Sequence, residues 1–142
     1  IRCREVGHKY LKEKKIPKKI EIVKKEYKAS YGKEIFISAE DKKQNILIGF
    51  CRLRFPYKPH RKEIDKKTAI VRELHVFGPL AEIGKKSLWQ HKGLGKKLLK
   101  EAEETAKKNN KTKIAIISGI GVRNYYRKHN YKLQGAYMCK NL

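Results

Sequence analysis

This sequence of 142 residues is poor in cysteine, in acidic residues and in long apolar runs. Its three cysteines, Cys3, Cys51 and Cys139, lie far apart in the chain. They form no Cys-x-x-Cys metal motif, and their odd number argues against a disulfide framework, so we expect a reducing, cytoplasmic location. No run approaches the roughly 18 to 20 apolar residues that a membrane span needs, and no apolar signal segment stands near the start, so no membrane partner is predicted.

Acidic residues are scarce beside basic ones. The chain has 37 Lys and Arg against 14 Asp and Glu, which gives a formal net charge of +23. An excess of this size attracts polyanions across a Debye length and speeds their arrival. Thermophile and AT-rich genomes also enrich lysine, but glutamate normally rises with it, and here glutamate does not follow closely. The composition therefore favours nucleic acid as the macromolecular partner.

The length of the chain fits one domain with a real core. Because the first residue is Ile1, we expect a piece excised from a longer protein. Residues 1–19 show no strong periodicity and are predicted to be a linker, which leaves residues 20–142 as the domain. Branched and apolar residues predict strands over 20–28, 34–39, 46–55, 68–77, 113–118, 131–133 and 136–140, and helical spacing predicts helices over 93–108 and 122–129. This order predicts a mixed α/β fold with a strand–helix–strand crossover.

The most specific motif is Gln90-x-x-Gly93-x-Gly95, which stands between a predicted strand and a predicted helix. Glycines at the start of a helix leave backbone N–H groups bare where the helix dipole is positive, so the motif predicts an anion site. Gln90 can donate a hydrogen bond, and Lys92 and Lys96 add positive charge. A P-loop is excluded because no Gly-Lys-Ser/Thr follows, and a dinucleotide fold is disfavoured because repeated βαβ units are lacking. The pattern indicates the pyrophosphate of coenzyme A, with a turn that binds nothing as the alternative.

A second group of candidate residues follows the buried strand. Acyl transfer from a thioester releases a thiolate, which a phenol such as Tyr125 or Tyr126 can protonate. Successive helix positions lie about 100° apart, so at most one of these two side chains is expected to face the site. An amine acceptor would also need a base, and Glu73 and His75 share one face of a predicted strand. Core packing of the tyrosines and a salt bridge of Glu73 are the alternatives.

Together these motifs resemble the GNAT acetyltransferase superfamily over residues 20–142. Within it, the chain is similar to the acetyltransferase domain of the Elongator catalytic-subunit family at Val71–Val76, Trp89–Gly95, Ile117–Arg123, Tyr125–Lys128 and Tyr137–Met138. Residues 1–7 resemble the segment between the two domains of that family. The high lysine and isoleucine content suits an archaeal member.

The resemblance implies a GNAT-type mixed sheet with flanking helices and an acetyl-CoA-dependent acyltransferase. It implies a cofactor site formed by Leu74, His75, Val76, Phe77, Gln90, His91, Lys92, Gly93, Leu94, Gly95, Lys96, Asn124 and Tyr126. Within that site, Tyr126 is expected near the thiol. The full-length family modifies the wobble uridine of tRNA, using an upstream radical SAM domain with S-adenosylmethionine and an iron–sulfur cluster. Cys3 is similar to one of a group of zinc-binding cysteines whose other members would lie upstream, so no metal is expected in this chain.

Three functions stay open at this stage. The first is an acetyl-CoA-binding domain that supplies the acetyl group for C5 modification of the tRNA wobble uridine. The second is a protein lysine acetyltransferase of the histone type, against which the basic composition counts, because it repels basic tails. The third is a tRNA-binding module with a vestigial acetyl-CoA pocket.

Overall fold

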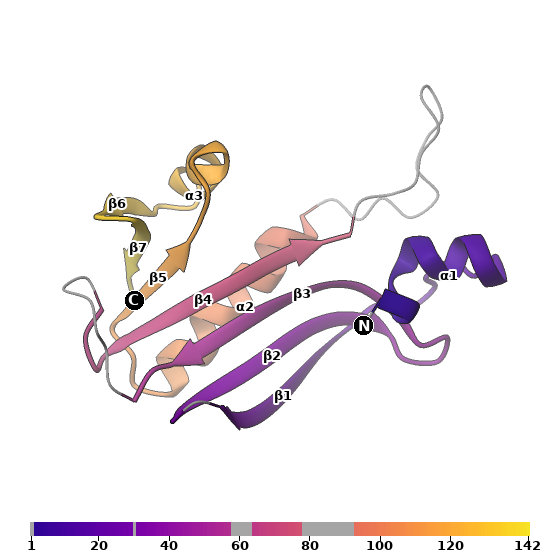
Figure 1. Ribbon diagram of the computed structural model, residues 1–142, viewed down its shortest axis with the longest axis horizontal. Coiled ribbons are helices and arrows are strands. Elements are labelled where there is room, and N and C mark those ends of the chain that lie inside the picture. Colours follow the sequence, from indigo (N-terminus) through magenta and orange to yellow (C-terminus); the bar gives the residue numbers. More distant parts are fainter. Residues whose placement is uncertain (1, 30, 58–63, 78–92) are drawn as a thin grey trace.

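The computed structural model of the chain describes residues 2–29, 31–57, 64–77 and 93–142 (Figure 1). The described residues form a seven-stranded sheet in the order β1-β2-β3-β4-β5-β7-β6. The strands are β1 (Glu21–Ala29), β2 (Gly32–Asp41), β3 (Ile46–Phe55), β4 (Thr68–Val76), β5 (Lys113–Ile117), β6 (Lys132–Gln134) and β7 (Tyr137–Asn141). The helices are η1 (Arg2–Arg4), α1 (Val6–Glu13), α2 (Leu94–Lys108), η2 (Ile120–Val122) and α3 (Arg123–Arg127). This arrangement confirms the predicted mixed sheet with flanking helices.

Strands β1 to β4 form an antiparallel meander whose register places apolar residues side by side. Ile37 of β2 lies opposite Cys51 of β3, and Leu53 of β3 lies opposite Val71 of β4. All four residues are fully buried. Because side chains alternate across a strand, this register assembles one continuous apolar face for a helix to cover.

Helix α2 covers that face of the sheet (Figure 1). Its Leu98, Ala102 and Ala106 recur every four residues and are all fully buried, as the helical spacing predicts. Gly49 of β3 allows the close approach, since a β-carbon there would lie 3.3 Å from Leu98 Cδ1. Because side chains alternate along a strand, the residues between those that face α2, such as Phe50 and Arg52, face away from it.

Strands β4 and β5 are parallel neighbours that pair over only part of their length. Pairing runs from Thr68 opposite Lys113 to Val71 opposite Ile116. At the same point the pairing of β4 with β3 shifts register, which leaves Arg72 as an extra residue on β4. Beyond it β4 continues alone beside β3, and β5 turns away (Figure 1). The two strands thus splay apart, and we call residues 72–77 and 117–119 the β4–β5 fork.

The first residues of the chain differ from the predicted irregular linker. Residues 6–13 form helix α1, whose Val6 is fully buried in the core. Glu5 forms a parallel bridge with Leu47 of β3, and Arg4 is ion-paired with Glu40 of β2. The linker prediction is therefore wrong in its local structure. The apolar side chains that α1 directs towards the core are a single pair four residues apart. Such a pattern is too short to predict a helix in a lysine-rich stretch. The origin of this segment next to an upstream domain stays a prediction.

No helix in the described part of the chain is long and apolar enough to cross a membrane.

Candidate functional site

The amino end of α2 is the part of the predicted anion site that the structure describes. Gly93 precedes the helix with φ +79°, a left-handed conformation that glycine adopts without strain, and no atom of the described residues lies within 4 Å of where its β-carbon would be. The amide of Lys97 donates to the Gly93 carbonyl at 3.0 Å, so the amides of residues 94–96 have no partner within the helix. The first turn has no acidic side chain and no side-chain cap. The helix thus presents bare N–H groups at its positive end, as an anion site requires.

Three elements meet beside this helix end. A β-carbon on Gly95 would lie 2.9 Å from the Tyr125 hydroxyl of α3 and 3.7 Å from Val76 Cγ2 of β4. Only glycine fits between them without a shift. The structure therefore brings Gly95, Tyr125 and Val76, three of the predicted site residues, together at the fork.

The backbone of β4 at the fork has groups that no described strand pairs. The Phe77 amide donates to the Ile48 carbonyl of β3 at 2.9 Å. Because backbone groups alternate along a strand, those of Leu74 and Val76 point away from β3. On that side β5 pairs with β4 only as far as Val71. The N–H and C=O groups of Leu74 and Val76 are thus available to an extended ligand with amide groups.

The two adjacent tyrosines lie in different surroundings. Tyr126 is 6% exposed, and its ring packs edge-on against Tyr131 at 5.9 Å between centroids. Burial raises the pKa of Tyr126 to about 12. Tyr125 is 39% exposed with its hydroxyl beside Gly95, and burial raises its pKa as well. Both phenols are therefore protonated at neutral pH, but the one that reaches the end of α2 is Tyr125.

The two candidate bases lie on the sheet face opposite α2. Glu73 lies opposite Arg52, and its carboxylate is 3.6 Å from the Arg52 guanidinium, so Glu73 is in a salt bridge, with a partner on β3 that the sequence did not indicate. His75 lies opposite Phe50, and its ring is 6.0 Å from that of Phe50 and 4.6 Å from that of Phe77. Neither side chain is on the face that α2 covers.

A buried carboxylate, that of Glu34, lies on the same face of the sheet and is paired with several arginines there. Glu34 is 3% exposed, and its oxygens lie 2.9 Å from Arg72, 3.2 Å from Arg54 and 3.8 Å from Arg52. Burial alone would raise the pKa of Glu34, but hydrogen bonds from Tyr27 and the arginines outweigh it, and the pKa is lowered. Three guanidinium groups thus share one carboxylate.

A hollow of about 310 Å³ opens beside this cluster, lined by Arg54, Ile70, Arg72 and Ile117. Ile70 pairs with Arg54, so the hollow lies on the face away from α2, where β4 and β5 diverge. Arg54 and Arg72 give it a positive lining at the fork.

Sequence reasoning missed Ser118, directly after β5. Its Oγ is buried and has no hydrogen-bond partner among the described residues. Ser118 has the same parity as Ile116, which pairs with the core residue Val71, so its side chain lies on the α2 side of the fork. A buried hydroxyl without a partner is costly unless a ligand or water satisfies it. The signal that could have identified Ser118 is its position directly after a buried strand and before Gly119.

The remaining predicted residues are less informative. Leu94 is buried, so only its backbone can reach a ligand, whereas Lys96 is exposed. The Asn124 side chain accepts a hydrogen bond from Arg127 at 2.7 Å. Gln90, His91 and Lys92 lie outside the described residues.

The cysteines are separate in the structure as well. Cys3 is exposed, while Cys51 and Cys139 are buried and not disulfide-bonded. Burial raises the pKa of Cys51 to about 12, which keeps it as an inert thiol. Within the described ranges no three His, Cys, Asp or Glu side chains come together as a metal site.

The chain is similar in sequence to proteins of known name. The chain is 57% identical to a tRNA uridine(34) acetyltransferase of Methanocaldococcus infernus, a match that covers 100% of the chain and 28% of the relative. It is 44% identical to Elongator complex protein 3 of Danio rerio, over 100% of the chain and 27% of that protein. The chain thus spans little more than a quarter of the length of these relatives.

A solved structure shows the same fold. The archaeal Methanocaldococcus infernus Elp3 with an N-terminal deletion matches with a TM-score of 0.93 and 56% identity, covering 100% of this chain and 35% of that one. The family model described as Acetyltransferase (GNAT) family matches residues 5–131. That range includes α1, the strands of the fork and the amino end of α2. The chain therefore belongs to the acetyltransferase (GNAT) family.

Proposed function

We propose that this chain binds acetyl-CoA at the β4–β5 fork and supplies the acetyl group for C5 modification of a tRNA wobble uridine. The observation that carries the proposal is the meeting of bare α2 amides, unpaired β4 backbone and the Tyr125 hydroxyl at one point. The names of the most similar proteins, tRNA uridine(34) acetyltransferase and Elongator complex protein 3, support the acceptor.

The described residues fit acetyl-CoA in three places. The amides of residues 94–96, at a helix end without acidic side chains, suit the pyrophosphate, and Gln90, His91 and Lys92 are proposed to complete its site. The backbone of Leu74 and Val76 suits the amide groups of the pantetheine arm. The Ser118 hydroxyl, buried without a partner on the α2 side, supplies a polar group inside the fork.

Bound acetyl-CoA supplies an acetyl group activated as a thioester. As the acetyl carbon bonds to the acceptor, its bond to sulfur would break and leave the electron pair on sulfur as a thiolate, and we assign the proton that neutralises this thiolate to the Tyr125 hydroxyl. Sequence analysis expected Tyr126 in this role. We favour Tyr125 because its hydroxyl reaches into the fork, at the point where Val76 of β4 also lies, whereas the Tyr126 ring packs in the core. Asn124 is proposed to contact the cofactor from the same helix.

The hollow beside the fork, where the acceptor is proposed to bind, suits RNA. Arg72, which lines the 310 Å³ hollow, is 46% exposed and can pair with a phosphate. The net charge of +23 supports a polyanionic partner and disfavours basic protein tails. Glu73, the candidate base for an amine, is ion-paired with Arg52. These features favour tRNA over protein lysines as the acceptor.

In the longer protein, we propose that this domain works with an upstream radical SAM domain that holds S-adenosylmethionine and an iron–sulfur cluster. Cys3, which is exposed, is proposed as a zinc ligand there.

The test combines two measurements on the 142-residue chain. A thermal shift with acetyl-CoA reports binding, and release of free CoA from acetyl-CoA, with and without tRNA, reports coupling to the acceptor. We expect a raised Tm and tRNA-stimulated CoA release. An unchanged Tm, together with CoA release that is indifferent to tRNA, would refute the proposal.

A further inference from the structure

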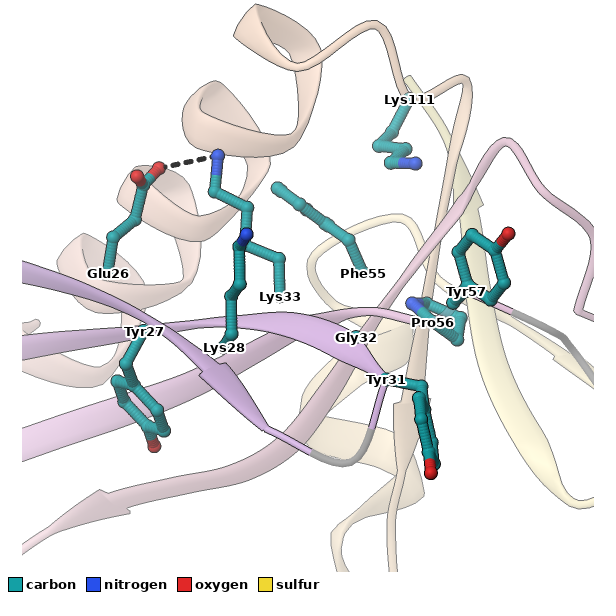
Figure 2. Close-up of a pocket in the computed structure, with 10 residues that line it drawn as sticks. All are labelled: Glu26, Tyr27, Lys28, Tyr31, Gly32, Lys33, Phe55, Pro56, Tyr57 and Lys111. Carbon is teal, nitrogen blue, oxygen red and sulfur yellow. Dashed lines mark ion pairs between the residues drawn. The ribbon is translucent and has the colours of Figure 1, made fainter.

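A second hollow, of about 790 Å³, lies at the opposite end of the sheet from the fork. The turn between β1 and β2, the end of β3 and the connection from α2 to β5 surround it (Figure 2). It is lined by Glu26, Tyr27, Lys28, Tyr31, Gly32, Lys33, Phe55, Pro56, Tyr57 and Lys111. We call it the lysine–tyrosine hollow. None of these residues has a part in the acetyl-CoA site.

The hollow has an excess of positive charge. Of the three lysines in its described lining, Lys33 is ion-paired at 2.8 Å with Glu26, the one acidic residue among those described lining residues. Figure 2 shows Lys28 and Lys33 on the α2 side of the hairpin, with Lys111 across the hollow. The Lys111 ammonium lies 5.1 Å from the centre of the Phe55 ring. Burial lowers the pKa of Lys111, and the charge of Lys67 lowers it further. Cations crowded in this way are stabilised when a polyanion binds.

Two tyrosines stand open at the rim. Tyr31 is 94% exposed and Tyr57 is 69% exposed. Tyr27 is different, since its hydroxyl donates to the buried Glu34 carboxylate at 2.8 Å. Figure 2 shows the Tyr31 ring on the opposite side of the hairpin from Lys28 and Lys33. Large aromatic rings exposed at the rim of a lysine-lined hollow are a combination on which unpaired nucleotide bases stack while lysines hold the phosphates.

The backbone holds Tyr31 in its exposed place. Ala29 pairs with Gly32 where β1 and β2 meet, and Tyr31, directly before Gly32, has φ +59°. Glycine or asparagine normally occupies this left-handed conformation. Arg54 anchors the hairpin by donating to the Ala29 carbonyl at 3.0 Å, with a guanidinium nitrogen 2.9 Å from where a Gly32 β-carbon would lie. A strained tyrosine on a fixed turn, with its ring in water, indicates a role in binding a partner rather than in stabilising the fold.

We propose that the lysine–tyrosine hollow is an RNA-contact site that takes an unstacked nucleotide of the tRNA, with its base on Tyr31 or Tyr57 and its phosphates on Lys28 and Lys111. The inference rests on the proposed function, which makes tRNA the substrate. The hollow lies near the start of the nine-residue β4, and the helix end proposed to hold the pyrophosphate lies beside Val76 at its end, which puts these two sites about 25 Å apart along the strand. The site therefore anchors the RNA and takes no part in the chemistry.

The test measures binding of a fluorescein-labelled, unmodified tRNA transcript by anisotropy at several salt concentrations. Tyr31→Asn keeps a residue that tolerates the left-handed turn but removes the ring, whereas Tyr31→Phe keeps the ring. We expect at least one of Tyr31→Asn and Tyr57→Ala to weaken binding at least about fivefold, the lower range for loss of one base stack, and Tyr31→Phe to bind within about twofold of wild type.

The lysine arm of the test uses a matched pair. Lys28→Ala is expected to reduce the slope of log affinity against log salt by about one, as for a lost phosphate contact. Lys132→Ala on β6 makes the same charge change on an exposed residue outside the hollow and is expected to leave the slope nearly unchanged.

Three results would overturn the inference: no tRNA binding by the wild-type chain, wild-type affinity of both Tyr31→Asn and Tyr57→Ala, or equal weakening by Tyr31→Phe and Tyr31→Asn. Acetyl-CoA binding by the same variants is expected to equal that of wild type. Loss of acetyl-CoA binding by the wild-type chain would count against the proposed function instead, so the two failures are distinguishable.

Discussion

The hydroxyl group of Tyr125 lies 2.9 Å from the point that a β-carbon on Gly95 would occupy. This contact joins α3 to the first turn of α2 and closes one side of the β4–β5 fork. It places a protonated phenol next to the helix end proposed to hold the pyrophosphate. The contact also couples the effects that substitutions at these two residues have on stability, and a double-mutant cycle measures this coupling.

Gly95→Ala is expected to destabilise the chain by about 1–3 kcal/mol, because the new methyl group collides with the Tyr125 hydroxyl. Tyr125→Phe removes that oxygen, so in its background the same substitution should be nearly neutral or stabilise by up to about 1 kcal/mol, the helix propensity of alanine over glycine. Urea unfolding of the four proteins measures the coupling. Equal effects of Gly95→Ala in both backgrounds would show that the contact is absent.

Tyr125→Phe is expected to lower the rate of CoA release from acetyl-CoA by about 10²–10⁴-fold, the usual contribution of a general acid. Tyr126→Phe is the matched control, because it removes the hydroxyl of the neighbouring tyrosine whose ring lies in the core. We expect it to keep most of the activity. Loss of activity in Tyr126→Phe with wild-type activity in Tyr125→Phe would reverse the assignment.

The regular elements of this fold could be predicted because their patterns are long. Strand β3 spans the predicted residues, Ile46–Phe55, and α2 ends at the predicted Lys108. Its buried stripe repeats every four residues, which is a pattern that tertiary contacts rarely overturn. Helix α1 was missed because Val6 and Tyr10 are the whole of its apolar stripe towards the core.

The site was less predictable, because its arrangement depends on contacts between distant elements. A separation of about 100° indicated that at most one tyrosine would face the site, but not which one. The orientation of α3 against α2 decides this. The partner of Glu73 depends on the register of β3 with β4, which shifts at Arg52 and Leu53. No pattern within one strand reveals a shift of that kind.

Asp41 makes the stability of the chain sensitive to acid. Its carboxylate accepts the Lys18 amide at 2.9 Å and the Gln44 side chain at 2.7 Å. The backbone bond from Lys18 is the largest cause that lowers the pKa of Asp41, from 3.8 to about 2. The folded state therefore binds a proton less readily than the unfolded state.

A lowered pKa in the folded state stabilises the fold above the unfolded value, and this stability is lost as the pH falls from 3.8 towards about 2. Asp41→Asn should flatten this part of the curve of unfolding free energy against pH. Denaturant unfolding between pH 2 and pH 6 checks it. An identical acid limb in Asp41→Asn would show that the Asp41 contacts do not contribute.

Val6→Ala is expected to destabilise the whole chain by about 1–3 kcal/mol, because Val6 is fully buried in the core. Tyr10→Ala, at a partly buried position of the same helix, should cost less. A single cooperative unfolding transition with a lowered midpoint is the expected observation. An unchanged midpoint for Val6→Ala would mean that α1 behaves as a separate linker after all.

The most direct test of the acetyl-CoA site is a calorimetric titration of the chain with acetyl-CoA, using two substitutions at Gly93. Gly93→Glu puts a carboxylate where the pyrophosphate is proposed to lie, while Gly93→Asn keeps a residue that tolerates the left-handed φ of +79°. We predict saturable one-site binding by the wild-type chain, similar binding by Gly93→Asn and no measurable binding by Gly93→Glu. Absence of binding by the wild-type chain, or wild-type affinity in Gly93→Glu, would contradict the account.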